Sequence, residues 1–196
     1  MPSQDNVTPS ADSIAAAASK AAKGKGLPPV HLWNPPFCGD LDIRIARDGT
    51  WFYLGTPIGR APLVRLFSTI LKLEDGKYFL VTPVEKVGIT VDDAPFVAVD
   101  FTAAGTGRDQ KLTFETNVGD FAEAGPAHPI RVTRDPETGE PAPYVMIRAG
   151  LEALIDRKSF YRLVELGVHE EHQGTRWFGL WSGGEFFPVI PSAELG

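Results

Sequence analysis

A ten-residue phrase that occurs twice constrains the fold of this chain more than any other feature. Residues 58–67 read IGRAPLVRLF and residues 155–164 read IDRKSFYRLV, so Ile, Arg, Arg and Leu recur at the same spacing. A glycine and then an aromatic pair follow each copy, within residues 76–79 and 174–178. Internal similarity at one long offset indicates a duplicated structural unit. We therefore expect two related units in this chain.

The elements around the two phrases also recur in the same order. Residues 41–45 alternate apolar and polar side chains, as a half-buried strand does, and Asp48-Gly49 supplies a hairpin turn. A helix is predicted from about Ala61 to Leu73, with strands after it. The second phrase likewise follows a hairpin, forms a helix capped by Asp156 and precedes another hairpin. These patterns predict an α+β fold in which each unit is a small antiparallel sheet or partial barrel packed by one helix.

We divide the chain into three parts. Residues 1–27 contain an Ala-rich stretch and are expected to form a mobile N-terminal tail, with a weakly helical arm as the alternative. The first α+β unit is expected over residues 28–100, because the prolines after residue 28 begin an extended segment. The second α+β unit is expected over residues 101–196.

Composition excludes several classes of protein. The formal net charge of −6 argues against general nucleic-acid binding, which needs clustered Lys and Arg. No apolar run approaches the roughly 20 residues of a membrane-spanning helix. Cys38 is the single cysteine, so an internal disulfide is excluded and a reducing cytoplasm fits best. We expect a cytoplasmic protein without a cofactor or a metal site.

Arg60 and Arg157 are the first candidate ligand-binding residues. Each lies at or just before the start of its predicted helix, where the helix dipole disfavours a cation. An anion such as a phosphate or carboxylate would explain the placement, because helix N–H groups and a guanidinium can share it. Asp42 and Glu85 are the candidate carboxylates that would orient the arginines. The alternative is that each arginine forms only a salt bridge to a carboxylate such as these two.

Aromatic side chains provide the second group of candidates. Trp33 or Tyr53 would offer a face on which a ligand ring stacks, and the alternative for Trp33 is that it seals the edge of the core. Cys38 and His31 resemble a nucleophile with a base, but no third catalytic group is identifiable. We assign no catalytic residue, and leave open whether the protein is an enzyme while expecting that it is not.

Nearly all of the chain past the N-terminal tail resembles the bacterial domain-of-unknown-function family 1285, and the most specific motifs lie in the first half, beginning with His31 and Trp33 before Pro35. The resemblance rests on GDLDIRI at 39–45, RDGTWFYLGTPIGR at 47–60, LVRLFSTIL at 63–71, DGKYFLVTPVEK at 75–86 and VDDAPF at 91–96. It implies a domain duplication whose second domain is superficially similar to pleckstrin-homology folds. It further implies a nucleotide-based ligand between the domains and a role in signal transduction, with no catalytic residues to transfer.

Two functions from different classes follow. The first is a non-enzymatic module that binds an anionic, nucleotide-like small molecule between the two units. The second is a protein–protein interaction module that uses a sheet edge or the aromatic residues 177–181. An enzyme that uses Cys38 or the acidic residues comes third.

Overall fold

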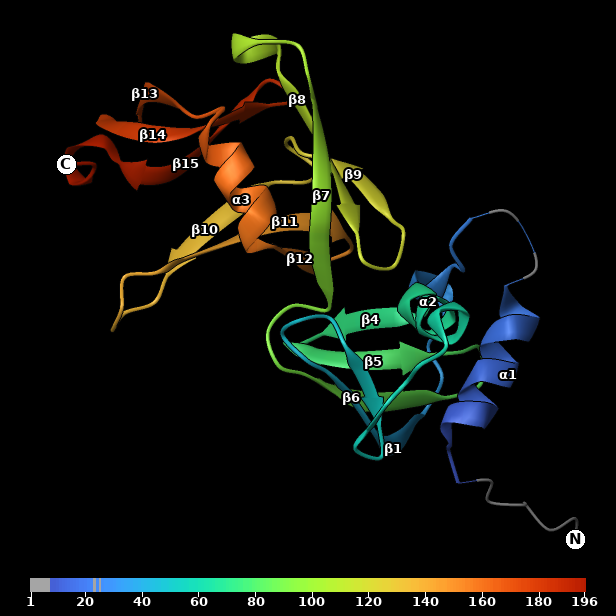
Figure 1. The fold of residues 1–196 in the computed structure, drawn as a ribbon. Coiled ribbons are helices and arrows are strands. Elements are labelled where there is room, and N and C mark those ends of the chain that lie inside the picture. Colours follow the sequence, from blue (N-terminus) through green and yellow to red (C-terminus); the bar gives the residue numbers. More distant parts are fainter. Residues whose placement is uncertain (1–7, 23, 25) are drawn as a thin grey trace, which may run out of the picture. The chain divides into compact units, whose positions relative to one another are not determined.

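The chain folds into two compact units, Met1–Asp92 and Asp93–Gly196. The computed structural model describes residues 8–22, 24 and 26–196. Both units are α+β, and each contains a six-stranded sheet packed by helices (Figure 1). The α+β class and the two-unit organisation are therefore confirmed. The boundary lies earlier than the expected residue 100, because the strand that begins at Phe96 pairs only with strands of the second unit.

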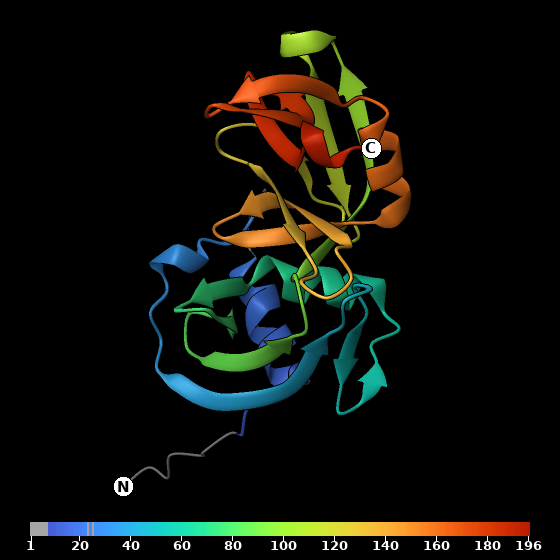
Figure 2. The same ribbon diagram turned by 90° about the vertical axis from the view of Figure 1, so that its left-hand side faces the viewer.

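Unit 1 is a curled sheet with two helices. The sheet has the order β3-β2-β1-β6-β5-β4, in which β1 and β6 are parallel and all other neighbours are antiparallel. It curls around helix α1 (Figure 2). Its elements are α1 (Ala11–Ala21), η1 (Val30–Leu32), β1 (Phe37–Ile45), β2 (Trp51–Tyr53), β3 (Thr56–Pro57), α2 (Ala61–Thr69), β4 (Leu71–Glu74), β5 (Lys77–Val81) and β6 (Lys86–Val91).

Helix α1 makes part of the expected tail a packed element of unit 1. Ser10 and Ser13 form a reciprocal capping box at its N-terminus. Ile14 and Ala18 are completely buried, and the backbone N–H of Ala11 donates to the Tyr53 hydroxyl at 3.5 Å. The helical arm is thus what the structure shows over Ala11–Ala21, because one small apolar stripe is enough to attach the helix.

Helix α2 is shorter than the sequence predicts. It ends at Thr69, and Leu71 begins strand β4 opposite Leu80. The hydroxyls of Ser68 and Thr69 donate to backbone carbonyls three residues earlier at 2.6 Å, a local bond that competes with helix continuation. The predicted end at Leu73 is therefore wrong, because apolar side chains at 70–73 satisfy a buried strand as well as a helix.

Unit 2 contains a six-stranded sheet, a separate three-stranded sheet and one α-helix among its described elements. The first sheet has the order β10-β11-β12-β7-β8-β9, with β12 and β7 parallel, and the second has the order β13-β14-β15. The elements are β7 (Phe96–Ala104), η2 (Gly107–Asp109), β8 (Lys111–Thr116), β9 (Phe121–Glu123), β10 (Ile130–Arg134), β11 (Pro141–Arg148), β12 (Leu151–Ile155), α3 (Arg157–Val164), β13 (Val168–His172), β14 (Thr175–Ser182), β15 (Glu185–Pro191) and η3 (Ser192–Glu194).

A shared kernel of three strands, a helix and three strands confirms the duplication. Strands β1–β3, α2 and β4–β6 of unit 1 correspond to β10–β12, α3 and β13–β15 of unit 2, and the antiparallel pairings within each set of three strands are the same. The backbone shows the same repeat. In the described chain, positive φ outside glycine occurs at Leu54, Asp75, Ala149 and Gln173, each followed by a glycine at an equivalent hairpin turn. Unit 2 adds the meander β7–β9 at the free edge of β12.

The kernels differ where their first and last strands meet. In unit 1, β1 pairs with β6 in a parallel ladder. In unit 2 the equivalent strands β10 and β15 are neighbours, yet they belong to separate sheets. Strand β15 carries Pro188 and Pro191, which have no N–H to donate, whereas β6 contains no proline. The seam between β10 and β15 therefore stays open.

Candidate functional site

A pocket of about 240 Å³ lies at the open seam of unit 2, beneath α3. We call it the α3 pocket, and its lining is mostly apolar. The residues that line it are Arg134, Gly139, Pro141, Phe160, Val164, Phe178, Val189, Ile190 and Leu195. They come from β10, the β10–β11 turn, β11, α3, β14, β15 and the segment after η3. The pocket is thus built where unit 1 has continuous sheet.

Helix α3 contributes two side chains to the wall of the pocket. Phe160 and Val164 are four residues apart on α3 and present one apolar side to the pocket. In the repeated phrase Val164 corresponds to Phe67, whose larger ring is fully buried and stacks on Trp51 at 6.2 Å between centroids. Val164 is instead 39% exposed. The neighbouring Leu163 is the fully buried residue at the end of α3, so Val164 is left at the pocket.

A glycine positions the aromatic wall of the pocket. A Cβ atom at Gly167 would lie 2.0 Å from Cζ of Phe178, so the Phe178 ring rests directly against the backbone after α3. Any larger residue at 167 would push this ring from its place. Gly167 therefore has a packing role as well as a place at the end of the helix.

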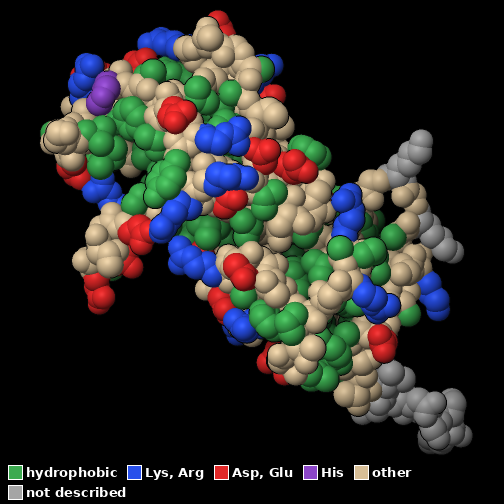
Figure 3. Space-filling model, viewed as in Figure 1, with side chains coloured by type: hydrophobic (Ala, Val, Ile, Leu, Met, Phe, Trp, Pro, Cys, Tyr) green, Lys and Arg blue, Asp and Glu red, His purple; other side chains and the backbone are tan. Residues whose placement is uncertain are grey.

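One arginine lines the pocket, a second pairs with a residue beside the lining, and both partner carboxylates are exposed. Arg134 lines the pocket and its Nη1 lies 2.6 Å from Oε2 of Glu194. Arg157 begins α3, and its Nη2 lies 2.6 Å from Oε1 of Glu140, which is flanked by the lining residues Gly139 and Pro141. Lys and Arg side chains gather over α3 beside apolar surface (Figure 3). Exposed pairs of this kind contribute about 0.2–1 kcal/mol, so an incoming anion can replace the carboxylates.

Of the two candidate arginines, only Arg157 lies near this pocket. Its partner is Glu140, so a salt bridge exists, but with a different carboxylate from the two considered in the sequence. Arg60 is the N-cap residue of α2, where its side chain makes no capping bond, and it is exposed. Across the described residues, no ion pair joins Arg60 to Asp42 or Glu85. The two arginines therefore lie in different environments: Arg157 is paired with a carboxylate near the pocket, whereas Arg60 is an exposed N-cap residue of α2.

The other candidate residues occupy different parts of unit 1. Trp33 is half-buried beside β4, and its carbonyl accepts a bond from Nζ of Lys72 at 3.4 Å. Tyr53 is half-buried against the start of α1. Asp42 is exposed on β1, and Glu85 lies in the β5–β6 turn, where its carbonyl accepts from the Thr82 N–H at 2.9 Å. Trp33, Tyr53 and Glu85 therefore each take part in contacts within unit 1.

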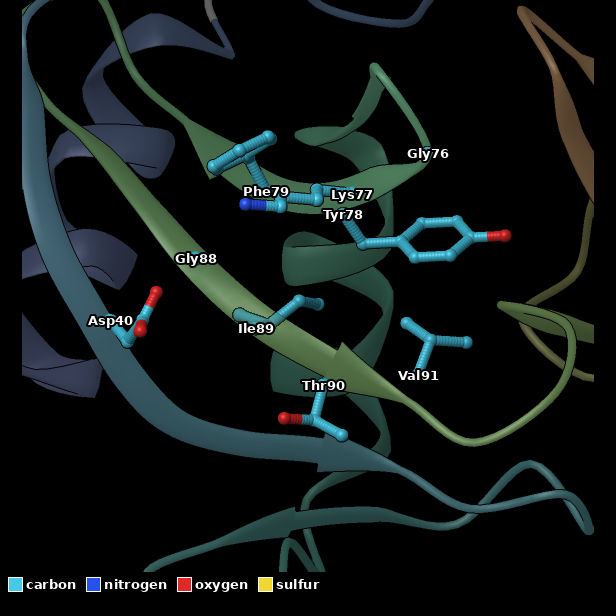
Figure 4. Close-up of a pocket in the computed structure, with 9 residues that line it drawn as sticks. All are labelled: Asp40, Gly76, Lys77, Tyr78, Phe79, Gly88, Ile89, Thr90 and Val91. Atoms are coloured by element: carbon cyan, nitrogen blue, oxygen red, sulfur yellow. The ribbon is translucent and has the colours of Figure 1, made fainter.

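A second hollow of about 290 Å³ lies on the sheet of unit 1 (Figure 4). Its floor is Gly88 of β6, where a Cβ atom would lie 2.2 Å from Oδ1 of Asp40. The Asp40 carboxylate thus lies over a strand position that has no side chain, with Lys77 and Phe79 on the neighbouring β5. A carboxylate suits a hydrogen-bond donor rather than an anion. This hollow therefore does not match the chemistry expected from Arg60 and Arg157.

Neither the cysteine nor the aromatic C-terminal region forms a clear site. Cys38 is exposed, and its Sγ donates to the Pro36 carbonyl at 3.3 Å. Trp177 and Trp181 are half-buried, and Nε1 of Trp181 donates to Glu170 at 3.2 Å. Among the described residues, no three His, Cys, Asp or Glu side chains are placed to hold a metal ion. The described helices also include none long and apolar enough to cross a bilayer.

Sequence reasoning missed most of the α3 pocket. Arg134, Phe178 and Leu195 come from three distant segments, and nothing local to each marks it as part of a site. The one readable signal lay in the repeat itself, where the last apolar position changes from Phe67 to Val164. Val164 lines the pocket and is partly exposed, whereas Phe67 is fully buried in unit 1.

Comparisons with known proteins agree on one relationship. Residues 28–94 match the model of the "Domain of unknown function (DUF1285), N-terminal domain", and residues 95–189 match that of the corresponding C-terminal domain. A crystal structure of a DUF1285 family protein from Silicibacter pomeroyi DSS-3 is 67% identical, with a TM-score of 0.84 over 92% of this chain and 97% of that chain. A second, from Shewanella baltica OS155, is 31% identical, with a TM-score of 0.51 over 64% of this chain and 91% of that one. No curated protein matches.

Proposed function

Because this chain belongs to the DUF1285 family, which is described as of unknown function, we propose its role from the geometry of unit 2. It is a non-enzymatic module that binds an anionic small molecule in the α3 pocket. The observation that carries the proposal is an apolar pocket lined by Arg134, with Arg157 paired to Glu140 beside the lining, and with an exposed carboxylate as the partner of each arginine. Ligand pockets commonly combine an apolar lining with a few polar groups that fix orientation.

The pocket chemistry favours binding over catalysis. Its lining contains no Ser, Cys, His, Asp or Glu that could serve as nucleophile or general base, and Arg134 is the one charged residue among those that line it. Arginine is suited to holding a carboxylate or phosphate because its N–H groups form a planar fork. We place this module in the cytoplasm, where binding of the ligand to unit 2 would serve signalling.

The α3 pocket replaces the cleft between units as the proposed site, since its lining residues all belong to unit 2. Arg157 keeps its proposed role at the rim. A direct role for Arg60 stays a prediction. The aromatic docking surface is a weaker alternative, because Trp177 and Trp181 are half-buried and Trp181 is bonded within its own sheet.

Thermal shift measurements against octanoate, octyl phosphate and adenosine monophosphate test the proposal. A ligand at 100 times its Kd stabilises the folded protein by about 2.7 kcal/mol, which is readily measured as a rise in Tm. Arg157→Gln is expected to weaken binding of whichever anion stabilises the protein. Arg60→Gln is the matched control at the equivalent position of unit 1.

The outcomes separate the two arginines. Binding that falls with Arg157→Gln and not with Arg60→Gln supports the α3 pocket. The reverse pattern would move the site to unit 1 and overturn the assignment. No stabilisation by any of the three anions at millimolar concentration would count against the function itself.

A further inference from the structure

The residues after β15 place an apolar side chain and a carboxylate at the rim of the α3 pocket. Leu195 is one of the lining residues and is 45% exposed. Its neighbour Glu194 places a carboxylate on Arg134 at 2.6 Å. An apolar group and a carboxylate are therefore presented side by side to the apolar lining and to the arginine. We call residues Ser192–Leu195 the C-terminal segment.

We infer that the α3 pocket binds a small amphipathic carboxylate, and that the C-terminal segment holds the same place in the free protein and is displaced by it. The inference rests on the proposed function and names the ligand class and the regulation of that site. The ligand's carboxylate takes the position of the Glu194 carboxylate on Arg134. Its apolar chain takes the position of Leu195 and extends over Phe178 and Val164.

The attachment of the segment is weak enough for this exchange. The side chains of Arg134 and Glu194 are 38% and 50% exposed, so their pair is partly screened by solvent. The second side-chain attachment is a bond of 2.7 Å between Nδ1 of His169 and the Ser192 hydroxyl, which is also exposed. Within the segment, the Leu195 N–H donates to the Ser192 carbonyl at 3.2 Å. No buried side chain in the described residues of this segment resists its release.

Size and charge restrict the ligand further. With Leu195 still in its wall the pocket is about 240 Å³, and this small, mostly apolar space suits a short apolar chain better than the polar groups of a whole nucleotide. The lining offers one arginine to the head group and apolar surface to the rest. A medium-chain carboxylate such as octanoate meets both conditions. It is also the free small-molecule counterpart of the Glu194 and Leu195 side chains.

The first experiment measures octanoate affinity for the full chain and for a Glu194→Gln/Leu195→Ser variant by titration calorimetry. The variant removes the internal competitor and keeps the chain length. Affinity is expected to rise by about three- to tenfold, because a competitor that occupies the site lowers apparent affinity by the fraction it blocks. Ser192→Ala, which breaks the His169 contact, should produce a smaller rise in the same direction.

Two further arms identify the head-group contact. Arg134→Gln in the variant background is expected to weaken octanoate binding by about tenfold or more, because it removes a charge-assisted hydrogen bond to the carboxylate. Arg108→Gln is the matched control, an arginine of unit 2 that lies outside the pocket lining and is 75% exposed. 1-Octanol, which has the chain without the charge, is expected to bind at least tenfold more weakly than octanoate.

Amide NMR on the full chain follows the segment directly. Octanoate is expected to move the Leu195 amide signal to a position typical of disordered chain while signals of Phe178 and Val164 shift. Shifts at Phe178 with an unchanged Leu195 amide would overturn displacement. Circular dichroism of each variant shows whether it is folded, and Ser192→Ala supplies the test if the double variant is not.

The failures of the two proposals can be told apart. Octanoate that binds the full chain and the double variant equally would overturn the competition and leave the proposed function standing. Binding of octyl phosphate without octanoate would overturn the ligand class alone. No binding of either anion to full chain or variant would overturn both. A synthetic peptide of residues 190–196 that binds the variant when octanoate does not would reassign the pocket to peptides and overturn the inference.

Discussion

The two units share one kernel of strands and a helix, but its first and last strands form a ladder in unit 1 and border an apolar pocket in unit 2. In unit 1, β1 and β6 form a parallel ladder, and Phe67 of α2 is fully buried. In unit 2, β10 and β15 have no ladder, and Val164 stands 39% exposed at the equivalent position of α3. The comparison teaches that topology alone does not decide whether a cavity forms. Side-chain volume and backbone hydrogen-bonding capacity at one seam decide it.

The additions to each kernel follow from this difference. Unit 1 covers its curled sheet with α1, whose Ile14 is completely buried. Unit 2 adds the meander β7–β9 to the edge of β12. Its six-stranded sheet therefore continues from β12 into β7 and does not include β15. The seam beside β15 is then left to α3 and the C-terminal segment to cover.

The largest expected effect is on the stability of unit 1. Phe67→Ala removes a buried ring that packs on Trp51 and is expected to lower the free energy of unfolding by about 3–5 kcal/mol. Val164→Ala at the equivalent position is expected to cost less than about 1 kcal/mol, because that side chain is already partly in solvent. Urea denaturation of both variants measures the difference. Equal losses in the free energy of unfolding would contradict the difference in burial between Phe67 and Val164.

The second prediction converts unit 2 toward unit 1. Val164→Phe places the unit 1 residue in the α3 pocket and is expected to weaken octanoate binding at least about tenfold while the protein stays folded. Tyr161→Phe is the control on the same helix, since Tyr161 is 62% exposed and does not line the pocket. Calorimetric titration measures both. Undiminished binding by Val164→Phe would remove this pocket as the site.

The third prediction concerns a charge cluster on the sheet of unit 1. Lys72 and Lys86 each place Nζ 2.9 Å from the Glu74 carboxylate, and these bonds lower the pKa of Glu74 below its ordinary value of 4.5. A lowered pKa in the folded state contributes stability above pH 4.5 that is lost as the pH falls through the folded pKa. The equivalent position in unit 2 is His172, so unit 2 lacks this contribution.

Glu74→Gln is expected to lower stability near pH 7 by about 0.2–1 kcal/mol, since the cluster is partly exposed. The parent and the variant should converge in stability as the pH drops below 4.5, which denaturation at a series of pH values will show. A difference that persists unchanged at pH 3 would mean that Glu74 acts through packing and not through its charge.

The smallest effect is expected at Cys38. Its exposed thiol should react with iodoacetamide in the folded protein, and the product should keep the Tm and octanoate affinity of the parent. Mass spectrometry follows the modification. A modified protein that no longer binds octanoate would connect unit 1 to the site and break the separation of roles between the units.

The sequence by itself determined the repeat and most of the local elements. The alternation at residues 41–45, the Asp156 cap and the glycines after Asp75 and Gln173 act within a few residues, so they can be read without knowing what packs on them. The end of α2 was misjudged because apolar residues 70–73 fit a buried strand equally well. Arg157 was found from its place at a helix start, although its actual partner, Glu140, lies 17 residues away along the chain.

Only the tertiary structure decided that unit 2 has an apolar pocket at this seam. Arg134, Phe178 and Leu195 meet because β10, β14 and the C-terminal segment converge on one seam, and that convergence depends on strand pairing across long separations. The exchange of Phe67 for Val164 could be read in the repeat, but its meaning depends on whether neighbouring strands close the gap. In unit 1 a ladder closes it, and in unit 2 two prolines in β15 help to keep it open.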